Sequence, residues 1–401
     1  MNCNLLGMFW LGSKCSDAVG AAGTAGFFLW LAMAFILIPK IGAEVGVAQS
    51  TGAEKMSEAR KYVNHTIQMN IFLAIFYSFF IFFLRYRLIS FFNLGDVNVV
   101  NMGVNYLSVI SLGIVFFFIN PVLTGIMNGY GNSKTPFIIN TIGLIVNMIF
   151  DPLFIFGYGP FPSLGVKGAA LATIFSQLVV TVLFIVIIKY RDDFEVLFYE
   201  LKILKKPEKY YLKKIIKLGI PVAAQEALFA IFAMFIARII AQWGPIAIAV
   251  QKVGAQIESI SWRTAAGFST ALTAFVGQNF GAKKWDRLVK GYMKTLILMS
   301  AIGIFATFLF FFYGGEIFAM FIPEAEAIKI GSNYLRIMAY SQLLMMVEIA
   351  TAGAFNVLGK TLSLAIVGIL FNSFRIPAEL ILTKFFAMGL DGVWWSISIS
   401  S

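Results

Sequence analysis

The chain has 401 residues, of which 59% are hydrophobic and only 13% are charged, about half the charged share of an ordinary soluble domain. This composition excludes a water-soluble enzyme, and one His with two Cys is too few for His-rich metal sites, Ser-His-Asp catalysis or a disulfide framework. The net charge of +11 does not indicate nucleic-acid binding, because the basic residues lie in short gaps between apolar runs rather than on one soluble face.

Ten apolar runs are long enough to cross about 30 Å of hydrocarbon as helices. In chain order they cover residues 20–50, 63–86, 100–128, 136–158, 168–189, 213–242, 246–277, 293–313, 330–357 and 362–387. A shorter apolar piece remains at each end, from Asn4 to Leu11 and from Val393 to Ser401. We therefore expect a twelve-helix protein whose first and last helices are incomplete in this chain.

The loops predict both the orientation and the division of the chain. Lys and Arg concentrate in the loops after the first, third, fifth, seventh and ninth runs, which the positive-inside rule places in the cytoplasm. The longest gap, from Arg191 to Leu212, is charged and is typical of a linker. We expect an N-terminal lobe of residues 1–195, a cytoplasmic linker of residues 196–212 and a C-terminal lobe of residues 213–401, in a multi-pass protein of a prokaryotic cytoplasmic membrane.

The two halves of the chain repeat each other. Four sets of residues recur in the same order about 225 residues later, which chance rarely produces. They are Gln49, Gly52, Ala53 and Lys55 with Gln278, Gly281, Ala282 and Lys284; Asn128 and Gly131 with Asn356 and Gly359; Asn147 and Pro152 with Asn372 and Pro377; and Gly165 and Gly168 with Gly389 and Gly392. Six helices in each repeat give both lobes the same orientation. We expect an all-α membrane protein whose two six-helix lobes are related by a pseudo-two-fold axis along the membrane normal, with a cavity between them.

Asp151 is the leading functional candidate in the first half, because a charge within the hydrocarbon is unfavourable unless it has a role. It lies in an apolar run, and Asn147 is one helical turn earlier on the same face. Removal from water disfavours the charged form of a carboxyl group, so such a group can carry a proton. Pro152 lacks a backbone donor and can free a carbonyl for an ion. The alternative is that Asp151 only caps the helix near the outer interface.

Polar residues also interrupt the apolar runs elsewhere. We interpret the following residues as candidates for lining a substrate cavity, since polar groups within the hydrocarbon are functional candidates and an aromatic face attracts cations: Glu258, Gln256, Gln225, Glu226, Asn372 and Trp262. Lys40 with Glu44, and Arg375 with Glu379, are four residues apart and are interpreted as structural or gating ion pairs. Glu258 could instead pair with Arg263, and His65 is interpreted as a residue flanking a loop. We expect no metal and no cofactor.

Four motifs resemble the multidrug and toxic compound extrusion (MATE) family of transporters. They are GNSKTP at residues 131–136, NMIFDPLFIFG at 147–157, LGVKGAALATIFSQ at 164–177 and VGQNFGAKK at 276–284. The resemblance implies a twelve-helix, two-lobed antiporter that exports amphipathic, often cationic compounds in exchange for H⁺ or Na⁺ by a rocker-switch motion, acting as a monomer. It also implies that Asn147, Asp151 and Thr173 couple transport to the ion. One position departs from the family, because Gly7 stands where the first helix commonly carries an Asp.

Two other functions remain open at this point. A flippase of related architecture for lipid-linked oligosaccharide or peptidoglycan precursors would need basic residues for pyrophosphate, and Lys40, Arg263 and Arg375 lie within apolar runs. A membrane enzyme that uses Asp or Glu is disfavoured, because the chain offers no clustered His, Cys or Ser in the setting of a nucleophile.

Overall fold

The computed structural model describes residues 16–92, 96–158, 162–199, 201–321 and 324–400, and over these residues the chain forms helices and no strands. The chain divides into two compact units, Met1–Ala223 and Ala224–Ser401. They are called unit 1 and unit 2. The expected partial first helix, including Gly7, lies outside the described residues.

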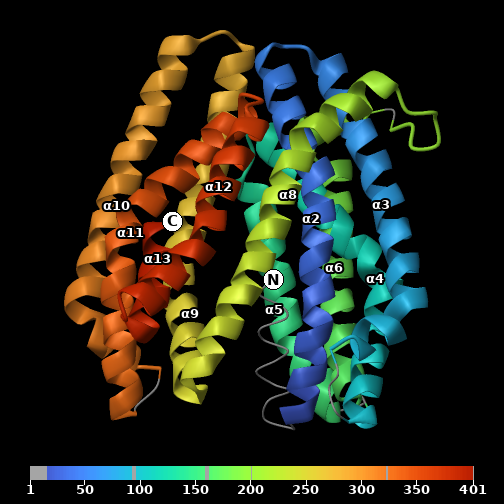
Figure 1. Ribbon diagram of the computed structural model, residues 1–401. Helices are drawn as coiled ribbons and strands as arrows, with labels where there is room; N and C mark the ends of the chain where they lie inside the picture. The colour runs from blue at the N-terminus through green and yellow to red at the C-terminus, as the bar shows by residue number, and fades with distance from the viewer. Residues whose placement is uncertain (1–15, 93–95, 159–161, 200, 322–323, 401) are drawn as a thin grey trace. The chain divides into compact units, whose positions relative to one another are not determined.

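Unit 1 is a bundle in which α4 is the central helix (Figure 1). Its elements are α2 (Ser16–Gly52), α3 (Met56–Ser90), α4 (Val97–Gly129), α5 (Lys134–Pro152), the π-helical turn η1 (Leu153–Gly157), α6 (Val166–Tyr190) and α7 (Asp192–Phe198). Helix α4 packs against α2, α3 and α6, while α5 packs mainly on α6. Small and branched residues such as Ala25, Ile36 and Ile114 fill the core together with Tyr77 and Phe118.

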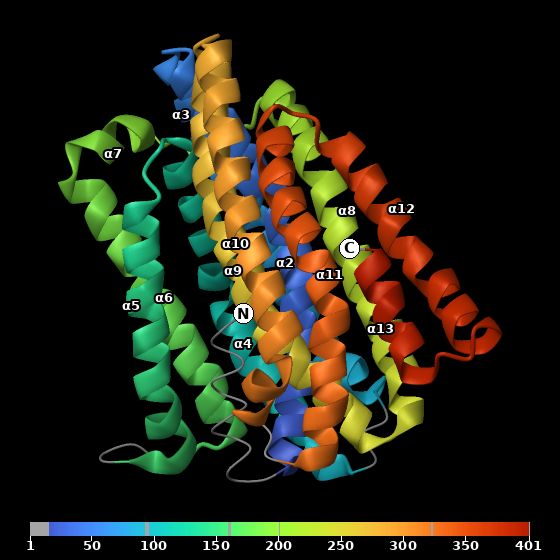
Figure 2. The same cartoon turned by 90° about the vertical axis from the view of Figure 1, so that its left-hand side faces the viewer.

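Helix α8 (Lys209–Ile240) begins in unit 1 and ends in unit 2. The other elements of unit 2 are η2 (Ala241–Trp243), α9 (Pro245–Gly281), α10 (Trp285–Ala319), α11 (Ala325–Val357), α12 (Thr361–Leu380), η3 (Ile381–Phe385) and α13 (Gly389–Ile399). Helices α9, α10 and α11 pack together, and α13 packs on α11 and α12 (Figure 2). Phe318, Tyr334 and Trp394 are fully buried in this core.

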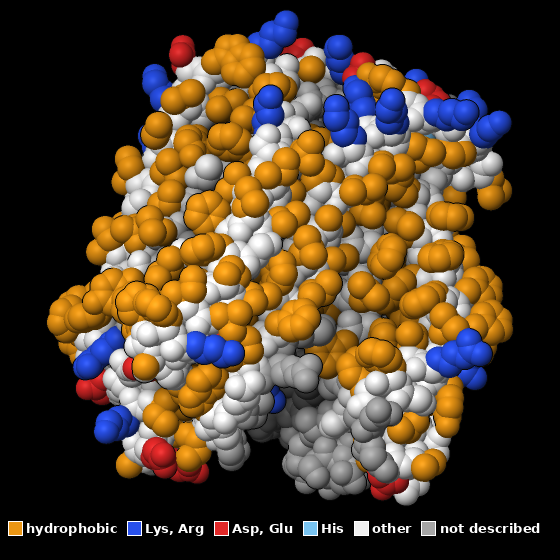
Figure 3. All heavy atoms as spheres, in the orientation of Figure 1, with side chains coloured by type: hydrophobic (Ala, Val, Ile, Leu, Met, Phe, Trp, Pro, Cys, Tyr) orange, Lys and Arg blue, Asp and Glu red, His pale blue; other side chains and the backbone are white. Residues whose placement is uncertain are grey.

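Nine helices within the described residues are long and apolar enough to cross a membrane. They coincide with nine of the ten apolar runs. The remaining run, 246–277, forms α9, which is as long as α2 but more polar. Gln251, Lys252, Gln256, Glu258 and Arg263 all lie in its first 19 positions and lower its hydropathy. In each unit the middle of the helices carries hydrophobic side chains, and Lys and Arg crowd the end where α2 meets α3 or α9 meets α10 (Figure 3). This distribution fits a chain whose helices span a bilayer.

The internal repeat is present in the backbone of each unit. Glu54, after α2, and Lys283, after α9, both adopt a positive φ, at 60° and 57°. The hydrogen bonds agree as well, because the Ala53 amide donates to the Gln49 carbonyl at 3.0 Å and the Ala282 amide to the Gln278 carbonyl at 2.9 Å. The two halves therefore share turn geometry as well as sequence.

A second pair of repeated features follows the two helix-interior prolines. A π-helical turn comes directly after Pro152 as η1, and another comes shortly after Pro377 as η3. A Cβ on Gly168 would lie 2.3 Å from the Phe154 carbonyl oxygen, and one on Gly392 would lie 3.0 Å from the Leu382 carbonyl carbon. Each glycine therefore lets the next helix pack directly on the backbone of its π-helical turn.

The segment between α7 and α8 is fastened to α3, although the sequence indicated only a charged linker. The Gln68 side-chain amide donates to the carbonyls of Lys202, Ile203 and Lys205 at 2.8–2.9 Å. Asn64 Oδ1 accepts from the Lys202 amide at 2.9 Å. Residue 199 and residues 201–208, which we call the anchored linker, are therefore held by side chains of one helix.

We expect Gln68→Ala to release the anchored linker. Loss of a net hydrogen bond of about 1 kcal/mol corresponds to about fivefold faster trypsin cleavage after Lys202 or Lys205, if local opening limits access. Timed digestion with mass spectrometry of the fragments measures this rate. Gln256→Ala in unit 2 is the matched control, and an unchanged cleavage rate in Gln68→Ala would show that this amide does not hold the linker.

Candidate functional site

Asp151 and Asn147 form a buried polar pair in the last two turns of α5. Neither side chain is exposed, and Asn147 Nδ2 donates to Asp151 Oδ1 at 3.3 Å. The second carboxylate oxygen of Asp151 and the amide oxygen of Asn147 are buried without a hydrogen-bond partner among the described residues. A buried unsatisfied acceptor costs about 1–3 kcal/mol, which a bound proton or cation would offset.

The local backbone explains why this pair lies at an irregular point of the helix. Pro152 follows Asp151 directly and has no amide hydrogen, and the chain continues as the π-helical turn η1. π-Helical turns often occur at functional sites. The spacing of four residues predicted that Asn147 and Asp151 share a face, and the hydrogen bond confirms that geometry. The side chain of Asp151 is enclosed, rather than exposed as a simple cap at an interface would be.

Thr173 lies on α6, the helix against which α5 mainly packs. Its side chain is buried, and its hydroxyl donates to the Ala169 carbonyl at 3.0 Å. Neighbouring helices thus carry the three residues to which the resemblance assigns coupling, but the observed hydrogen bonds join only Asn147 and Asp151 directly.

Unit 1 contains further buried amides that the sequence analysis missed. Asn120 Nδ2 donates to Gln177 Oε1 at 2.8 Å, and Asn120 Oδ1 accepts from the Thr181 hydroxyl at 2.8 Å, joining α4 to α6. Asn70 on α3 is fully buried, and neither polar atom of its amide has a partner among the described residues. The available signal in the sequence was a single amide within each apolar run, which is less unfavourable in a membrane than a charge.

A buried network in unit 2 joins four helices. The Tyr334 hydroxyl on α11 donates to Glu258 Oε1 on α9. Trp394 Nε1 on α13 donates to Gln251 Oε1 at 2.9 Å, and the Trp394 ring packs edge-on against the Tyr334 ring with 5.1 Å between the ring centres. Arg375 on α12 is close enough for its charge to act on Glu258. We call this set, together with Ser400 described next, the Glu258 network.

The spacing of four residues predicted an ion pair between Arg375 and Glu379. In the structure, Arg375 also contacts Ser400 and Phe229. Its Nε donates to Ser400 Oγ at 2.8 Å, and its guanidinium lies 5.8 Å from the ring centre of Phe229. Glu379 is buried and accepts a hydrogen bond from Thr383 Oγ1 at 3.2 Å. Sequence reasoning selected Glu258 and Arg375 but did not bring them together, and it missed Tyr334, Gln251 and Trp394.

The remaining sequence candidates lie in varied environments. Gln256 is exposed, whereas Gln225, Glu226, Asn372 and Trp262 are half-buried. Asn372 Nδ2 donates to the Gly368 carbonyl at 2.7 Å, and the Gln225 amide lies against the backbone of Gly368. In unit 1, Glu44 is buried and Lys40 is half-buried, and the charge of Lys40 acts on the Glu44 carboxylate.

Among the residues that the structure describes, no three His, Cys, Asp or Glu side chains are grouped so that they could hold a metal ion. The groups in unit 1 with buried oxygens still lacking a partner include Asp151 and Asn147. Carboxylate and amide oxygens are suitable ligands for a hard monovalent cation or a site for a proton.

Comparison with known proteins gives a consistent result across the chain. The MatE family model matches residues 2–153 and 221–381. The chain is 27% identical over 392 residues to the "Probable multidrug resistance protein NorM" of Thermotoga maritima, covering 96% of the chain and 82% of that relative. It is 24% identical over 390 residues to the "Probable multidrug resistance protein YoeA" of Bacillus subtilis, with the same coverage of 96% and 82%.

Solved structures of the same fold are also similar to this chain. A crystal structure of MATE in the bent conformation matches with a TM-score of 0.90 at 20% identity, covering 99% of this chain and 87% of that chain. An outward-facing multidrug resistance MATE family transporter of the MOP superfamily matches with a TM-score of 0.89 at 20% identity, covering 99% and 88%. At this identity the likeness establishes the fold.

Proposed function

Since the chain belongs to the MatE family of multi-pass membrane transporters, we propose that it exports amphipathic, often cationic small molecules in exchange for H⁺ or Na⁺ by alternating access. Family membership makes it a transporter of the cell membrane rather than an enzyme. Family membership establishes transport, and we propose the coupling ion and the substrate class.

One observation carries the ion-coupling proposal: a fully buried carboxylate in a membrane-length helix has an oxygen without a hydrogen-bond partner among the described residues. An ion gradient can shift the inward–outward equilibrium only if the ion binds the two states with different affinity. A proton or Na⁺ at Asp151 and Asn147 would neutralise a charge that is unfavourable inside the membrane. Thr173, on the adjacent helix, is proposed as a third member of this coupling site.

We propose that the candidates in unit 2 serve the substrate. Glu226 and Gln225 are half-buried and Gln256 is exposed, so these polar groups remain accessible to a cationic or hydrogen-bonding solute. Glu258 is already bound by Tyr334 and influenced by Arg375, which gives it a structural role in the arrangement observed here. A substrate would reach Glu258 only after this network rearranged.

Transport by purified protein in liposomes tests the proposal. With ethidium as the probe, we expect uptake driven by a proton or Na⁺ gradient and none when the gradient is collapsed by an ionophore. Protein-free liposomes with the same gradient are the control for passive entry. Uptake that continues unchanged without either gradient would contradict secondary antiport.

The flippase alternative derives support from Lys40, Arg263 and Arg375, three basic residues in long apolar helices. The charges of Lys40 and Arg375 act on the buried carboxylates Glu44 and Glu258, which reduces their availability to a pyrophosphate group. The same liposomes, loaded with a fluorescent phospholipid, would favour this alternative if the protein moved the lipid between leaflets but did not move ethidium.

A further inference from the structure

A basic cavity of about 320 Å³ lies within unit 1, between the start of α3, the end of α7 and the anchored linker. Among its lining residues, one is acidic and five are Lys or Arg. The acidic residue is Glu208, and the basic ones are Arg60, Lys61, Lys202, Lys205 and Lys206. Like charges gathered around one hollow repel one another, and a multiply charged anion in the hollow would relieve that repulsion.

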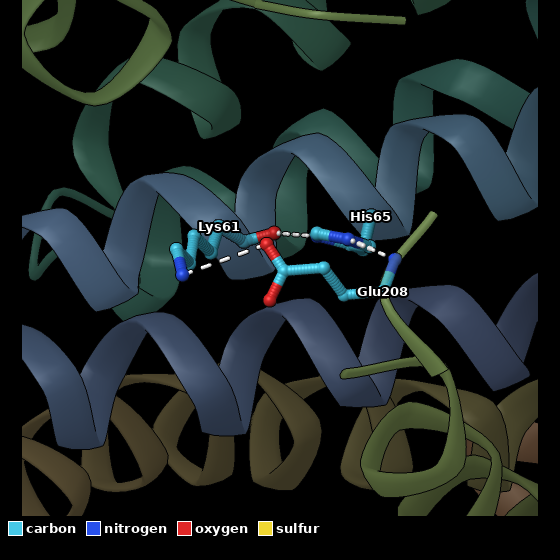
Figure 4. A network of polar contacts seen from close by, with 3 residues as sticks. All are labelled: Lys61, His65 and Glu208. Carbon is cyan, nitrogen blue, oxygen red and sulfur yellow. Dashed lines mark hydrogen bonds and ion pairs between the residues drawn. The ribbon is translucent and has the colours of Figure 1, made fainter. Parts of the chain in front are cut away.

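The single histidine of the chain holds one wall of this cavity in place (Figure 4). His65 Nε2 accepts from the Glu208 amide at 2.9 Å, and the Lys61 carbonyl lies 2.6 Å from His65 Nδ1. These two partners assign the neutral ring with the proton on Nδ1, because an amide hydrogen points at Nε2. His65 is buried and stacks on Tyr211, so it is a structural anchor rather than only a residue flanking a loop.

The basic side chains surround the cavity from two sides. On the helix side, Arg60 Nε donates to the Val196 carbonyl at 2.7 Å and its guanidinium lies over the Tyr199 ring at 5.3 Å. Lys61 Nζ lies 3.5 Å from Glu208 Oε1. On the other side, the lysines of the anchored linker are exposed while its backbone is held by Gln68 and Asn64. The loop is therefore already folded before any ligand arrives, which reduces the entropy lost on binding.

Apolar side chains of the same loop indicate the source of the anion. Leu204 is fully exposed, and Leu201, Ile203 and Tyr199 are also exposed beside the lysines. Exposed apolar residues next to lysines are typical of a segment that lies in the interface of a membrane. The positive-inside rule places this end of unit 1 at the cytoplasmic leaflet, whose anionic lipids attract basic residues.

We propose that this cavity binds a phosphate group, and that the phosphate belongs to the headgroup of an anionic phospholipid in the cytoplasmic leaflet. Arg60 and Lys61 contact the phosphate from α3, Lys202, Lys205 and Lys206 approach it from the anchored linker, and Leu204 enters the acyl region. The proposal does not depend on the transported substrate or the coupling ion. It assigns the anchored linker a lipid-binding role.

Binding to the delipidated 401-residue chain in detergent tests this assignment. The probes are short-chain phosphatidylglycerol, the matching phosphatidylcholine and free glycerol phosphate. Each lysine near an anionic headgroup contributes about a fivefold gain in affinity. We therefore expect the triple variant Lys202→Ala, Lys205→Ala, Lys206→Ala to bind phosphatidylglycerol about a hundredfold more weakly than the unmodified chain.

The control is the triple variant Lys283→Ala, Lys284→Ala, Lys290→Ala in unit 2. It removes two exposed lysines from the turn between α9 and α10 and a third near the start of α10. It should bind phosphatidylglycerol as the unmodified chain does. Equal binding by the two triple variants, or no preference for phosphatidylglycerol over phosphatidylcholine, would overturn the proposal. Binding of glycerol phosphate as tight as that of the lipid would retain the phosphate site and overturn its lipid source.

A second measurement covers the case in which the linker variant does not fold. In the unmodified chain, phosphatidylglycerol affinity should fall steeply as NaCl rises from low concentration to 0.5 M, because salt screens charges that are exposed to solvent. Affinity that does not respond to salt would contradict a site made of exposed lysines.

Discussion

Asp151→Asn should slow gradient-driven transport by a large factor while the protein remains folded. Asn has nearly the same shape as Asp and can still hydrogen-bond to Asn147, but it neither releases a proton nor balances a cation. Coupling between two binding events typically changes affinity by about 5–150-fold, and we expect a loss of uptake within that range. Initial rates of ethidium uptake under a fixed ion gradient measure the effect.

The Asp286→Asn variant provides the matched control for this substitution. Asp286 is exposed in the first turn of α10, so the same chemical change there should leave uptake unaltered. Melting curves of all three proteins in detergent separate loss of coupling from loss of folding. Uptake by Asp151→Asn equal to that of the unmodified protein would remove this carboxylate from the mechanism.

Arg375→Met should destabilise unit 2 more than most single substitutions in the chain. It leaves Glu258 buried without the positive charge that acts on it, and removal of one member of a buried charge pair typically costs about 3–5 kcal/mol. Replacing both members is often neutral, so adding Glu258→Gln should restore most of the lost stability. Unfolding of the detergent-solubilised chain in denaturant compares the two single variants and the double variant.

The double-variant cycle isolates the interaction, because residues that share a buried network deviate from additivity by about 0.5–3 kcal/mol. Lys290→Met is the control, since Lys290 is exposed on α10 and surface substitutions usually change stability by less than about 0.5 kcal/mol. Strict additivity of Arg375→Met and Glu258→Gln would show that Arg375 does not stabilise the Glu258 carboxylate.

The proteolytic resistance of the anchored linker and its proposed lipid binding both depend on the contacts of this loop with α3. Gln68, Asn64 and His65 fix the loop to α3, and the loop carries three of the five basic residues around the cavity. Loss of the Gln68 anchor should therefore weaken phosphatidylglycerol binding as well as speed proteolysis. These contacts hold the backbone of the lysines in place, so less entropy is lost when a ligand binds than for a mobile basic segment.

Features that depend on neighbouring residues along the chain could be predicted from the sequence. The apolar runs predicted the helices because burying unpaired backbone groups in hydrocarbon leaves few structures other than helices. The repeated residues predicted equivalent turns, as Glu54 and Lys283 show. The same local logic placed Asn147 one turn from Asp151, since four residues return a helix to nearly the same face.

Contacts between helices required the tertiary structure. Tyr334 is 76 residues from Glu258, and Glu208 is 143 residues from His65, so no periodicity along the chain relates them. The folding of the linker onto α3 depends in the same way on Gln68 meeting distant carbonyls, and the contact of α7 with α3 depends on Arg60 meeting the Val196 carbonyl. A helix sets which residues share a face, but the partner of that face depends on how side chains of different helices pack, and packing is decided by the whole bundle.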